Sequence, residues 1–531
     1  MQASWKLFLP GMGGAFLLFL LACFWFVEPL RLLGDGGTCR HLDTGLFILQ
    51  NHFVPTVNYV SAFFPKSPWM THSFIGDVLF GILYNMFGLN GIVFICALAL
   101  CLAIMWSYQF AAARGLGPVS CPVFTVVLIA VTSLHWSARC HLFSYLTFLV
   151  VYYLNYMANI KAWQRALLTG IAMCLWANFH GSFLVGIAAV AIKFAADIVQ
   201  NYLWNKNNRD TVISVESGGK ANVGAKGEVK SEPGRLPYES PMQAFTCLCA
   251  ALVGVLITPR GFGFYSYVVG YLSHPMILFH SDEWRPFDFT LGIASWATLA
   301  LYLLVVALWV VSRRVPDLAE FILVNFLFLS GLYTMRVIPY FALVALPALG
   351  PSWACWKANL AEGGGLLRQS LHWLFRLESN MEQKSLSLKT LALFQTGVCA
   401  LMALVFLLVP SFRITDMNPL KLPVQATDYI IKNKLDGLGF SLDNWGCYLY
   451  WRKKKPIFID DKTDFYPVEF IQTYMATMMA QPGWQKALEH YGIEYVLIPK
   501  STLLGTALSS SQDWKLIYSD NLADLYTRVG K

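Results

Sequence analysis

Long apolar runs separated by short polar stretches dominate the first 410 residues of the chain. A straight helix needs about 20 apolar residues to cross a bilayer, and several of these runs are near that length while others are shorter. The pattern predicts about 11 membrane-spanning helices. They are expected at residues 8–27, 89–110, 119–134, 142–158, 166–178, 182–198, 242–258, 291–311, 317–334, 338–350 and 390–410.

The pattern changes after residue 410, where short runs of strand-forming residues alternate with amphipathic stretches. Such alternation is typical of a small α/β domain, here over residues 411–531. Strands are expected at 447–451, 456–459, 494–498, 515–518 and 523–527, and helices at 424–433, 468–480 and 483–491. The predicted fold class is therefore an α-helical polytopic membrane protein with a small C-terminal α/β soluble domain.

Two polar stretches interrupt the predicted transmembrane domain of residues 1–410. Residues 199–240 contain few large apolar side chains, and we expect a flexible cytoplasmic linker there. Residues 351–389 form a second expected cytoplasmic connection, in which residues 366–377 are amphipathic and suited to a membrane surface.

Composition supports membrane insertion, since 56% of the residues are hydrophobic and only 13% are charged. Soluble domains carry about 25% charged residues. The net charge of +8 does not indicate a nucleic-acid partner, because excess Lys and Arg in membrane proteins mark cytoplasmic loops.

Charge also predicts the orientation of the chain. Lys and Arg are more frequent in the segments that become cytoplasmic when the N-terminus is placed inside the cell. An odd number of spans then places the C-terminal domain on the extracytoplasmic (periplasmic) side of the inner, cytoplasmic membrane. The first span lacks a clear small-residue cleavage site, so we expect it to be retained as an anchor.

A polar segment at residues 34–45, Gly-Asp-Gly-Gly-Thr-Cys-Arg-His-Leu-Asp-Thr-Gly, follows the first span and is predicted to be an outer loop. It contains Asp35, Arg40, His41 and Asp43. Ionisable groups at a membrane edge are costly unless they face water, protein or a substrate, so this segment is a candidate site. The alternative is a solvated loop that only ends a helix.

Further polar motifs are predicted on the same outer side of the membrane. Candidate residues in them are Asn178, His180, Glu283, Arg285 and Arg336. Any one of these motifs could be an ordinary polar helix end, but their location on one side predicts a shared cavity.

The C-terminal domain adds a cluster of three acids, Asp460, Asp461 and Asp464. The cluster could bind a cation or a substrate, although a solvated strand end is the expected structure.

Several motifs together resemble a bacterial family of polytopic membrane proteins within or near the C-type (GT-C) glycosyltransferase superfamily. The resemblance covers nearly the whole chain. It is carried by the segment 34–45, Val-Pro (54–55), Pro-Trp (68–69), Trp-Ala-Asn-x-His-Gly (176–181), Pro-Arg-Gly (259–261), Glu-Trp-x-Pro (283–286), Arg-x-Ile-Pro (336–339), Asn-Trp-Gly-x-Tyr-Leu-x-Trp (444–451), Phe-Ile-Asp-Asp (458–461) and Pro-Gly-Trp (482–484).

The resemblance implies transfer of a sugar from a polyprenyl-phosphate carrier to a glycan, lipid or protein acceptor outside the cytoplasmic membrane. It implies Asp35 and His41 as catalytic residues. The residues implied to bind substrate are Arg40, Asp43, Asn178, His180, Glu283, Arg285 and Arg336. It requires no cofactor and predicts no metal ligand set, but it leaves room for a divalent cation near Asp35 or Asp43.

One position departs from the family pattern, which often has a second Asp two residues after the first. Gly37 occupies that position here. A non-catalytic member that binds a lipid-linked glycan or partner proteins is therefore an alternative function. A transporter is a third, less favoured because the polar motifs lie on the outer side rather than at the membrane midplane.

Overall fold

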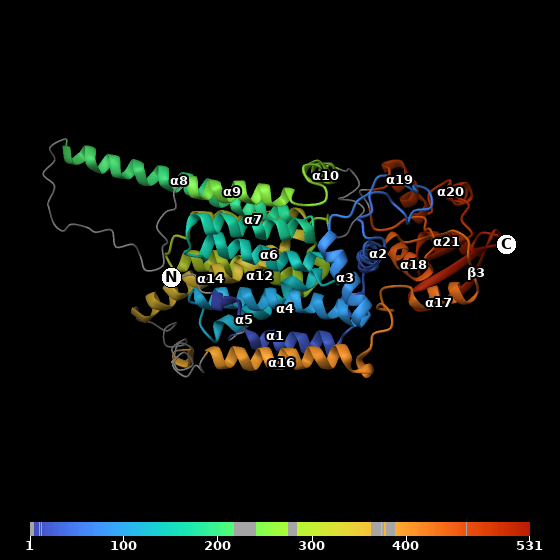
Figure 1. Ribbon diagram of the computed structural model, residues 1–531, viewed down its shortest axis with the longest axis horizontal. Coiled ribbons are helices and arrows are strands. Elements are labelled where there is room, and N and C mark those ends of the chain that lie inside the picture. The colour runs from blue at the N-terminus through green and yellow to red at the C-terminus, as the bar shows by residue number, and fades with distance from the viewer. Residues whose placement is uncertain are drawn as a thin grey trace.

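The computed structural model describes residues 5–9, 11, 13–216, 241–273, 284–362, 373, 376–378, 388–462 and 465–530. Its helices form an elongated bundle, and a small domain with a β-sheet lies at one end of it (Figure 1). The chain is thus mainly helical with a C-terminal α/β part, as the sequence predicts.

Every predicted apolar run forms a helix, and these helices run along the length of the bundle (Figure 1). They are α1 (Gly14–Ala22) with its continuation η2 (Cys23–Val27), α4 (Leu89–Ala113), α5 (Ser120–Thr132), α6 (His141–Tyr152), α7 (Ala162–Phe179), α8 (Phe183–Glu216), α9 (Pro241–Leu256), α12 (Ile293–Val311), α13 (Leu318–Tyr333), α14 (Ile338–Glu362) and α16 (Leu388–Leu408).

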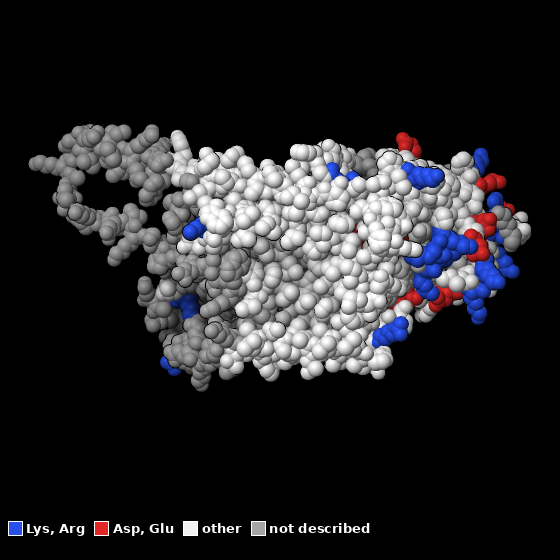
Figure 2. All heavy atoms as spheres, in the orientation of Figure 1, with Lys and Arg blue, Asp and Glu red and all other residues white. Residues whose placement is uncertain are grey.

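Five helical segments of the described residues are long and apolar enough to cross a membrane. They are Leu89–Ala113, Phe183–Leu203, Ile293–Val311, Met335–Leu360 and Thr390–Leu408. Shorter apolar helices accompany them. On the face shown in Figure 2, the described charged side chains gather mainly over the C-terminal domain, while the bundle surface is largely uncharged. The protein is therefore a multi-pass membrane protein.

Three boundary predictions are wrong. The segment 34–45 is not a loop, because α2 (Gly36–Asn51) begins in it. Residues 199–216 of the first expected linker continue α8, and residues 351–362 of the second continue α14. Polar composition lowers the hydropathy of these stretches without removing their helix propensity. The amphipathic stretch 366–377 lies almost entirely outside the described residues.

The C-terminal domain contains a four-stranded sheet in the order β1-β2-β4-β3. Strand β1 (Gly439–Ser441) runs parallel to β2 (Tyr495–Pro499), which pairs antiparallel with β4 (Ala523–Arg528); β4 pairs antiparallel with β3 (Trp514–Ser519). The accompanying helices are α17 (Val424–Lys432), α18 (Asp443–Lys453), α19 (Val468–Met478), α20 (Trp484–His490) and α21 (Leu503–Ser509).

Two of the expected strands are not strands. Residues 447–451 lie inside helix α18, where Trp445, Tyr448 and Leu449 are buried at the three- and four-residue spacing of one helix face. Residues 456–459 form no named strand; Ile457 makes an isolated bridge with Ser61 instead. Apolar runs this short do not distinguish a strand from a buried helix.

Close packing of α2 brings the bundle and the C-terminal domain together, with α3 (Phe74–Phe87) on one side of α2 and α18 on the other. A Cβ atom at Gly45 would lie 1.8 Å from the Asp77 carbonyl oxygen, and one at Gly36 would lie 1.7 Å from that of Asn444. Only glycine fits at these two contacts, so the glycines of segment 34–45 let α2 sit between its two neighbours.

Candidate functional site

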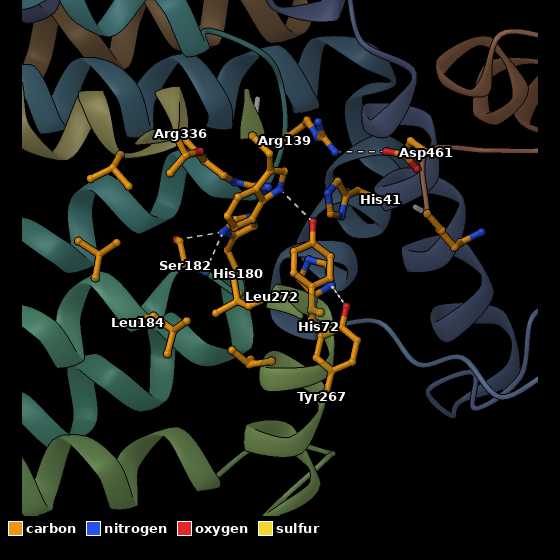
Figure 3. A pocket seen from close by; sticks show the side chains of 18 of the residues that line it. His41, His72, Arg139, His180, Ser182, Leu184, Tyr267, Leu272, Arg336 and Asp461 are labelled. Carbon is orange, nitrogen blue, oxygen red and sulfur yellow. Dashed lines mark hydrogen bonds and ion pairs between the residues drawn. The ribbon is translucent and has the colours of Figure 1, made fainter. Parts of the chain in front are cut away.

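A cavity of about 250 Å³ lies between the end of the helical bundle and the C-terminal domain (Figure 3). Its walls come from α2, the segment before α3, the α7–α8 connection, α10 (Gly263–Leu272), the start of α14 and the segment before residue 463. The lining residues are Arg40, His41, Trp69, His72, Arg139, His180, Gly181, Ser182, Leu184, Val185, Tyr267, Val268, Tyr271, Leu272, Trp284, Thr334, Arg336, Val337, Tyr340, Asp461 and Lys462.

Three arginines give this cavity a cationic wall: Arg40, Arg139 and Arg336. Arg336 donates a hydrogen bond to Nε2 of His180 at 3.1 Å, and its guanidinium lies 5.1 Å from the centre of the Trp284 ring. These contacts orient Arg336. The wall is therefore suited to a phosphate group, which guanidinium groups bind through charge-assisted hydrogen bonds.

His41 is held by a buried carboxylate. Its Nδ1 lies 2.6 Å from Oδ1 of Asp77, whose other oxygen accepts a hydrogen bond from Thr71. With a proton on Nδ1, the Nε2 atom is the acceptor, and it lies 3.5 Å from the Arg40 guanidinium. Burial, followed by the charge of Arg40, holds the pKa of His41 well below its ordinary value. The imidazole is therefore neutral at neutral pH.

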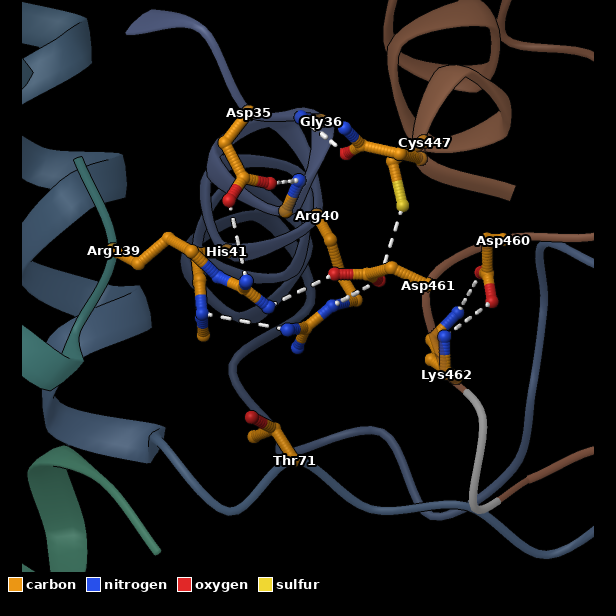
Figure 4. Close-up of polar contacts among 12 residues, drawn as sticks. Asp35, Gly36, Arg40, His41, Thr71, Arg139, Cys447, Asp460, Asp461 and Lys462 are labelled. Atoms are coloured by element: carbon orange, nitrogen blue, oxygen red, sulfur yellow. Dashed lines mark hydrogen bonds and ion pairs between the residues drawn. The ribbon is translucent and has the colours of Figure 1, made fainter. Parts of the chain in front are cut away.

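Asp461 joins the C-terminal domain to the arginines of the bundle (Figure 4). Its carboxylate lies 2.7 Å from Nε of Arg40 and 3.2 Å from a terminal nitrogen of Arg139. Burial alone would raise the pKa of Asp461, but the charges of Arg40 and Arg139 outweigh it and hold the pKa below the ordinary value. This carboxylate is ionised.

The expectation of a solvated strand end at the acidic cluster is wrong for Asp460 and Asp461. Asp460 is only 1% exposed and forms an ion pair with Lys462. The cationic partners of Asp461, Arg40 and Arg139, are hundreds of residues away in the sequence, so no local pattern shows them. Asp464 lies outside the described residues.

Asp35 is the N-cap of α2. One oxygen accepts a hydrogen bond from the Gly37 backbone at 2.7 Å, and the other lies 3.2 Å from Arg139 (Figure 4). Asp35 is outside the set of described residues that line the cavity. Its contacts position α2 and Arg139, and its predicted catalytic role stays a prediction.

Four of the predicted site residues meet in the cavity: Arg40, His41, His180 and Arg336. Asp43 instead faces two neighbouring cavities and pairs with Lys454.

The remaining predicted substrate-binding residues lie elsewhere. Asn178 donates to the carbonyl of Ile257 at 2.7 Å and ties α7 to the end of α9. The Arg285 carbonyl accepts from the Met335 backbone. Arg285 and Asn178 are outside the set of described lining residues, and Glu283 lies outside the described residues altogether.

Sequence reasoning missed Asp77, His72 and Tyr267 as site residues. A signal existed for Asp77, because it is an acid inside the apolar run Phe74–Phe87, and such acids usually have a functional or pairing role. His72 and Tyr267 come from separate segments and meet only in the fold, where the Tyr267 hydroxyl lies 3.4 Å from Nδ1 of His72.

His41, Asp77 and Cys140 form a group that could hold a metal ion, since their ligand atoms lie within 4.8 Å of one another. Asp77 is already hydrogen-bonded to His41 and Thr71, so an ion would have to replace these contacts. The group differs from the predicted location near Asp35 or Asp43.

No protein-family model matches the sequence, and no curated protein matches it. Among solved structures, the chain is similar to the oligosaccharyltransferase of Archaeoglobus fulgidus in the apo form, with a TM-score of 0.51 and 14% identity over 93% of this chain and 69% of that one. ArnT from Cupriavidus metallidurans bound to undecaprenyl phosphate gives a TM-score of 0.48 and 13% identity over 97% of this chain and 98% of that one.

At 14% identity the first likeness establishes the fold and not the reaction. It extends over the bundle and most of the C-terminal domain, which is the range of the sequence motifs. The chain therefore shares the overall fold of that oligosaccharyltransferase.

Proposed function

We propose that this protein is a glycosyltransferase that moves a sugar from a polyprenyl-phosphate carrier to an acceptor outside the cytoplasmic membrane. The observation that carries the proposal is the composition of the cavity, which joins three arginines to an aliphatic wall at the end of a membrane bundle. In this proposal the C-terminal domain is extracytoplasmic.

The two kinds of wall match the two parts of a polyprenyl phosphate. Leu184, Val185, Val268 and Leu272 line the cavity from α8 and α10, and they suit the hydrocarbon chain. Arg336 and the Arg40–Arg139 pair suit the phosphate. Aromatic side chains between them, including Trp284 and Tyr267, suit the level at which a membrane meets water.

His41 is the base that we propose for the transfer. Its Nε2 takes the proton of an acceptor hydroxyl as the hydroxyl oxygen forms a bond to the anomeric carbon of the sugar. The bond between that carbon and the phosphate oxygen breaks, and the polyprenyl phosphate leaves with the electron pair. The nearby guanidinium groups stabilise the charge on the leaving phosphate. Asp77, which lies 2.6 Å from Nδ1, fixes the orientation of the imidazole during this step.

The geometry favours His41 over Asp35 for this step. His41 lines the cavity, whereas Asp35 is occupied by the Gly37 backbone and Arg139. The family pattern still supports Asp35, so both variants should be compared.

Binding of undecaprenyl phosphate to the full-length protein in lipid nanodiscs tests the proposal. We expect Arg336→Ala to weaken binding by about tenfold or more, since a charge-assisted contact contributes about 1.5–3 kcal/mol. Arg413→Ala is the matched control, because Arg413 is exposed. No binding by the unchanged protein, or equal binding by the two variants, would contradict the proposal.

A second readout separates transfer from binding alone. Cell-surface glycans should change when the gene for this protein is deleted. Expression of the unchanged protein should restore them, and expression of His41→Gln should not. Binding without any glycan change would support the non-catalytic alternative. A reporter fused after residue 420 should be active only outside the cytoplasm.

A further inference from the structure

A cavity of about 610 Å³ lies further along α2 than the candidate site, toward the C-terminal end of that helix. Its walls come from α2, α3, the segment that follows α2 and the end of α18. The lining residues are Asp43, Leu46, Phe47, Leu49, Gln50, Tyr59, Asn85, Tyr450 and Lys454. We call this cavity the outer groove. Its volume is within the range of about 300–1,000 Å³ that is usual for small-molecule sites.

A small cavity of about 10 Å³ lies between the outer groove and the arginine-lined cavity. It shares Asp43, Tyr59 and Tyr450 with the outer groove. It shares Arg40, Trp69 and Lys462 with the arginine-lined cavity. A space of this size holds about one water molecule. The three cavities are therefore neighbours along α2, with the smallest beside Arg40.

The polar side chains of the outer groove offer both donors and acceptors. Asp43 accepts from Tyr59 at 3.2 Å and forms an ion pair with Lys454, so its position is fixed. The side chains of Gln50 and Asn85 are exposed and add two amide groups. Hydroxyl groups can donate and accept at once, so a ligand with several hydroxyls matches this mixture of carboxylate, amide and ammonium groups.

Aromatic rings supply a complementary flat surface. The Phe47 and Tyr59 rings stack with centroids 4.6 Å apart and planes 14° from parallel, and Tyr450 lies edge-on to Tyr59 at 6.2 Å. The stack makes a rigid wall next to the polar groups. None of the nine lining residues belongs to a strand, so the groove offers no strand edge to an extended peptide.

We propose that the outer groove binds a carbohydrate, and that this carbohydrate is the acceptor. The sugar ring lies against Tyr59 and Tyr450, and its hydroxyls bind Asp43, Gln50 and Asn85. One hydroxyl points into the small cavity toward Arg40, whose guanidinium is 3.5 Å from Nε2 of His41. Its use as an acceptor rests on the proposed function, whereas sugar binding by the groove does not.

Free disaccharides test the inference on the full-length protein in nanodiscs. The probes are N,N′-diacetylchitobiose, lactose and cellobiose, observed by saturation-transfer NMR. We expect at least one of them to bind, Tyr450→Ala to weaken its binding by about tenfold or more, and the Gln50→Ala/Asn85→Ala double variant to weaken it as well. The double variant changes only exposed side chains, so it should fold normally even if Tyr450→Ala does not. Asn51→Ala is the matched control on the same helix, since Asn51 is exposed and outside the set of lining residues.

Two outcomes would overturn the inference: none of the disaccharides binds, or the groove variants bind them as the unchanged protein does. Binding of a short peptide at the groove, with no binding of any sugar, would also overturn it. Measuring the binding of undecaprenyl phosphate to the same variants distinguishes a failure of this inference from a failure of the proposed function. Arg336→Ala should weaken lipid-phosphate binding and leave disaccharide binding intact, and Tyr450→Ala should do the reverse.

Discussion

The Asp461 carboxylate fills the space above Gly37, although the two residues belong to different parts of the chain. A Cβ atom at Gly37 would lie 2.8 Å from Oδ2 of Asp461 and 2.8 Å from Nε of Arg139. The family resemblance leads to the expectation of an acid at position 37. Here an acid from the C-terminal domain lies against that position, so the domain forms part of the candidate site.

Replacing Gly37 tests this packing. Gly37→Ala should lower the free energy of unfolding by about 1–3 kcal/mol, because the added methyl group would displace Asp461 or Arg139 from a filled space. Denaturation of the detergent-solubilised protein measures the change. Gly263→Ala is the control, since no atom lies within 4 Å of a Cβ there. Equal stability of the two variants would show that the contact can relax.

Removing the charge of Asp461 should destabilise the protein. Asp461→Asn leaves the partly buried Arg40 and Arg139 beside each other without their shared carboxylate. Losing one member of a fully buried ion pair costs about 3–5 kcal/mol, so we expect a loss of about 2–3 kcal/mol here. Chemical denaturation measures the loss, and adding Arg40→Gln should recover part of it. Asp436→Asn, which breaks an exposed pair with Lys455, should have little effect. If Asp461→Asn unfolds like that control, the ion pairs do not stabilise the fold.

His41 and Asp77 should act as one unit in transfer. His41→Gln and Asp77→Asn should each slow transfer by about 10²- to 10⁴-fold, the usual contribution of a positioned base, and the double variant should be little slower than either. Binding of undecaprenyl phosphate should persist in all three. The measurement is product formed per membrane-inserted protein molecule, with His490→Gln as the exposed control. If His41→Gln transfers sugar at the unchanged rate, His41 is not the base, and Asp35 becomes the candidate for that role.

Stability should fall as the pH falls below about 6.5. Burial, followed by neighbouring positive charges, holds the pKa values of His41, His72 and His180 well below the ordinary value. The unfolded chain therefore binds protons near pH 6.5 that the folded chain does not, so the contribution of these neutral histidines is complete above that pH and is lost below it.

Melting temperatures between pH 8 and pH 5 measure this dependence. His72→Asn should make the decline shallower, because it removes one of the three groups, while His490→Asn should leave the slope unchanged. A melting temperature that rises toward pH 5 would contradict the prediction.

Part of the candidate site could be predicted because polar residues in an apolar chain are conspicuous. Arg40, His41, His180 and Arg336 were selected on that ground and meet in one cavity. The same criterion, polarity within an apolar chain, also led to Asn178, which donates a hydrogen bond to the Ile257 carbonyl, and to Asp43, which faces the outer groove. Polarity at a membrane edge identifies a residue that needs a partner, but it does not distinguish a substrate from another part of the protein.

The sequence by itself determined the helical bundle, because the length and hydropathy of an apolar run are local properties and membrane insertion depends on them. It also indicated the C-terminal α/β part and the fold resemblance. Only the tertiary structure decided that segment 34–45 begins a helix held between α3 and α18, and that residues 447–451 are helical. The partners of Asp461 were decided there too, because an ion pair such as Arg40–Asp461 joins residues 421 positions apart.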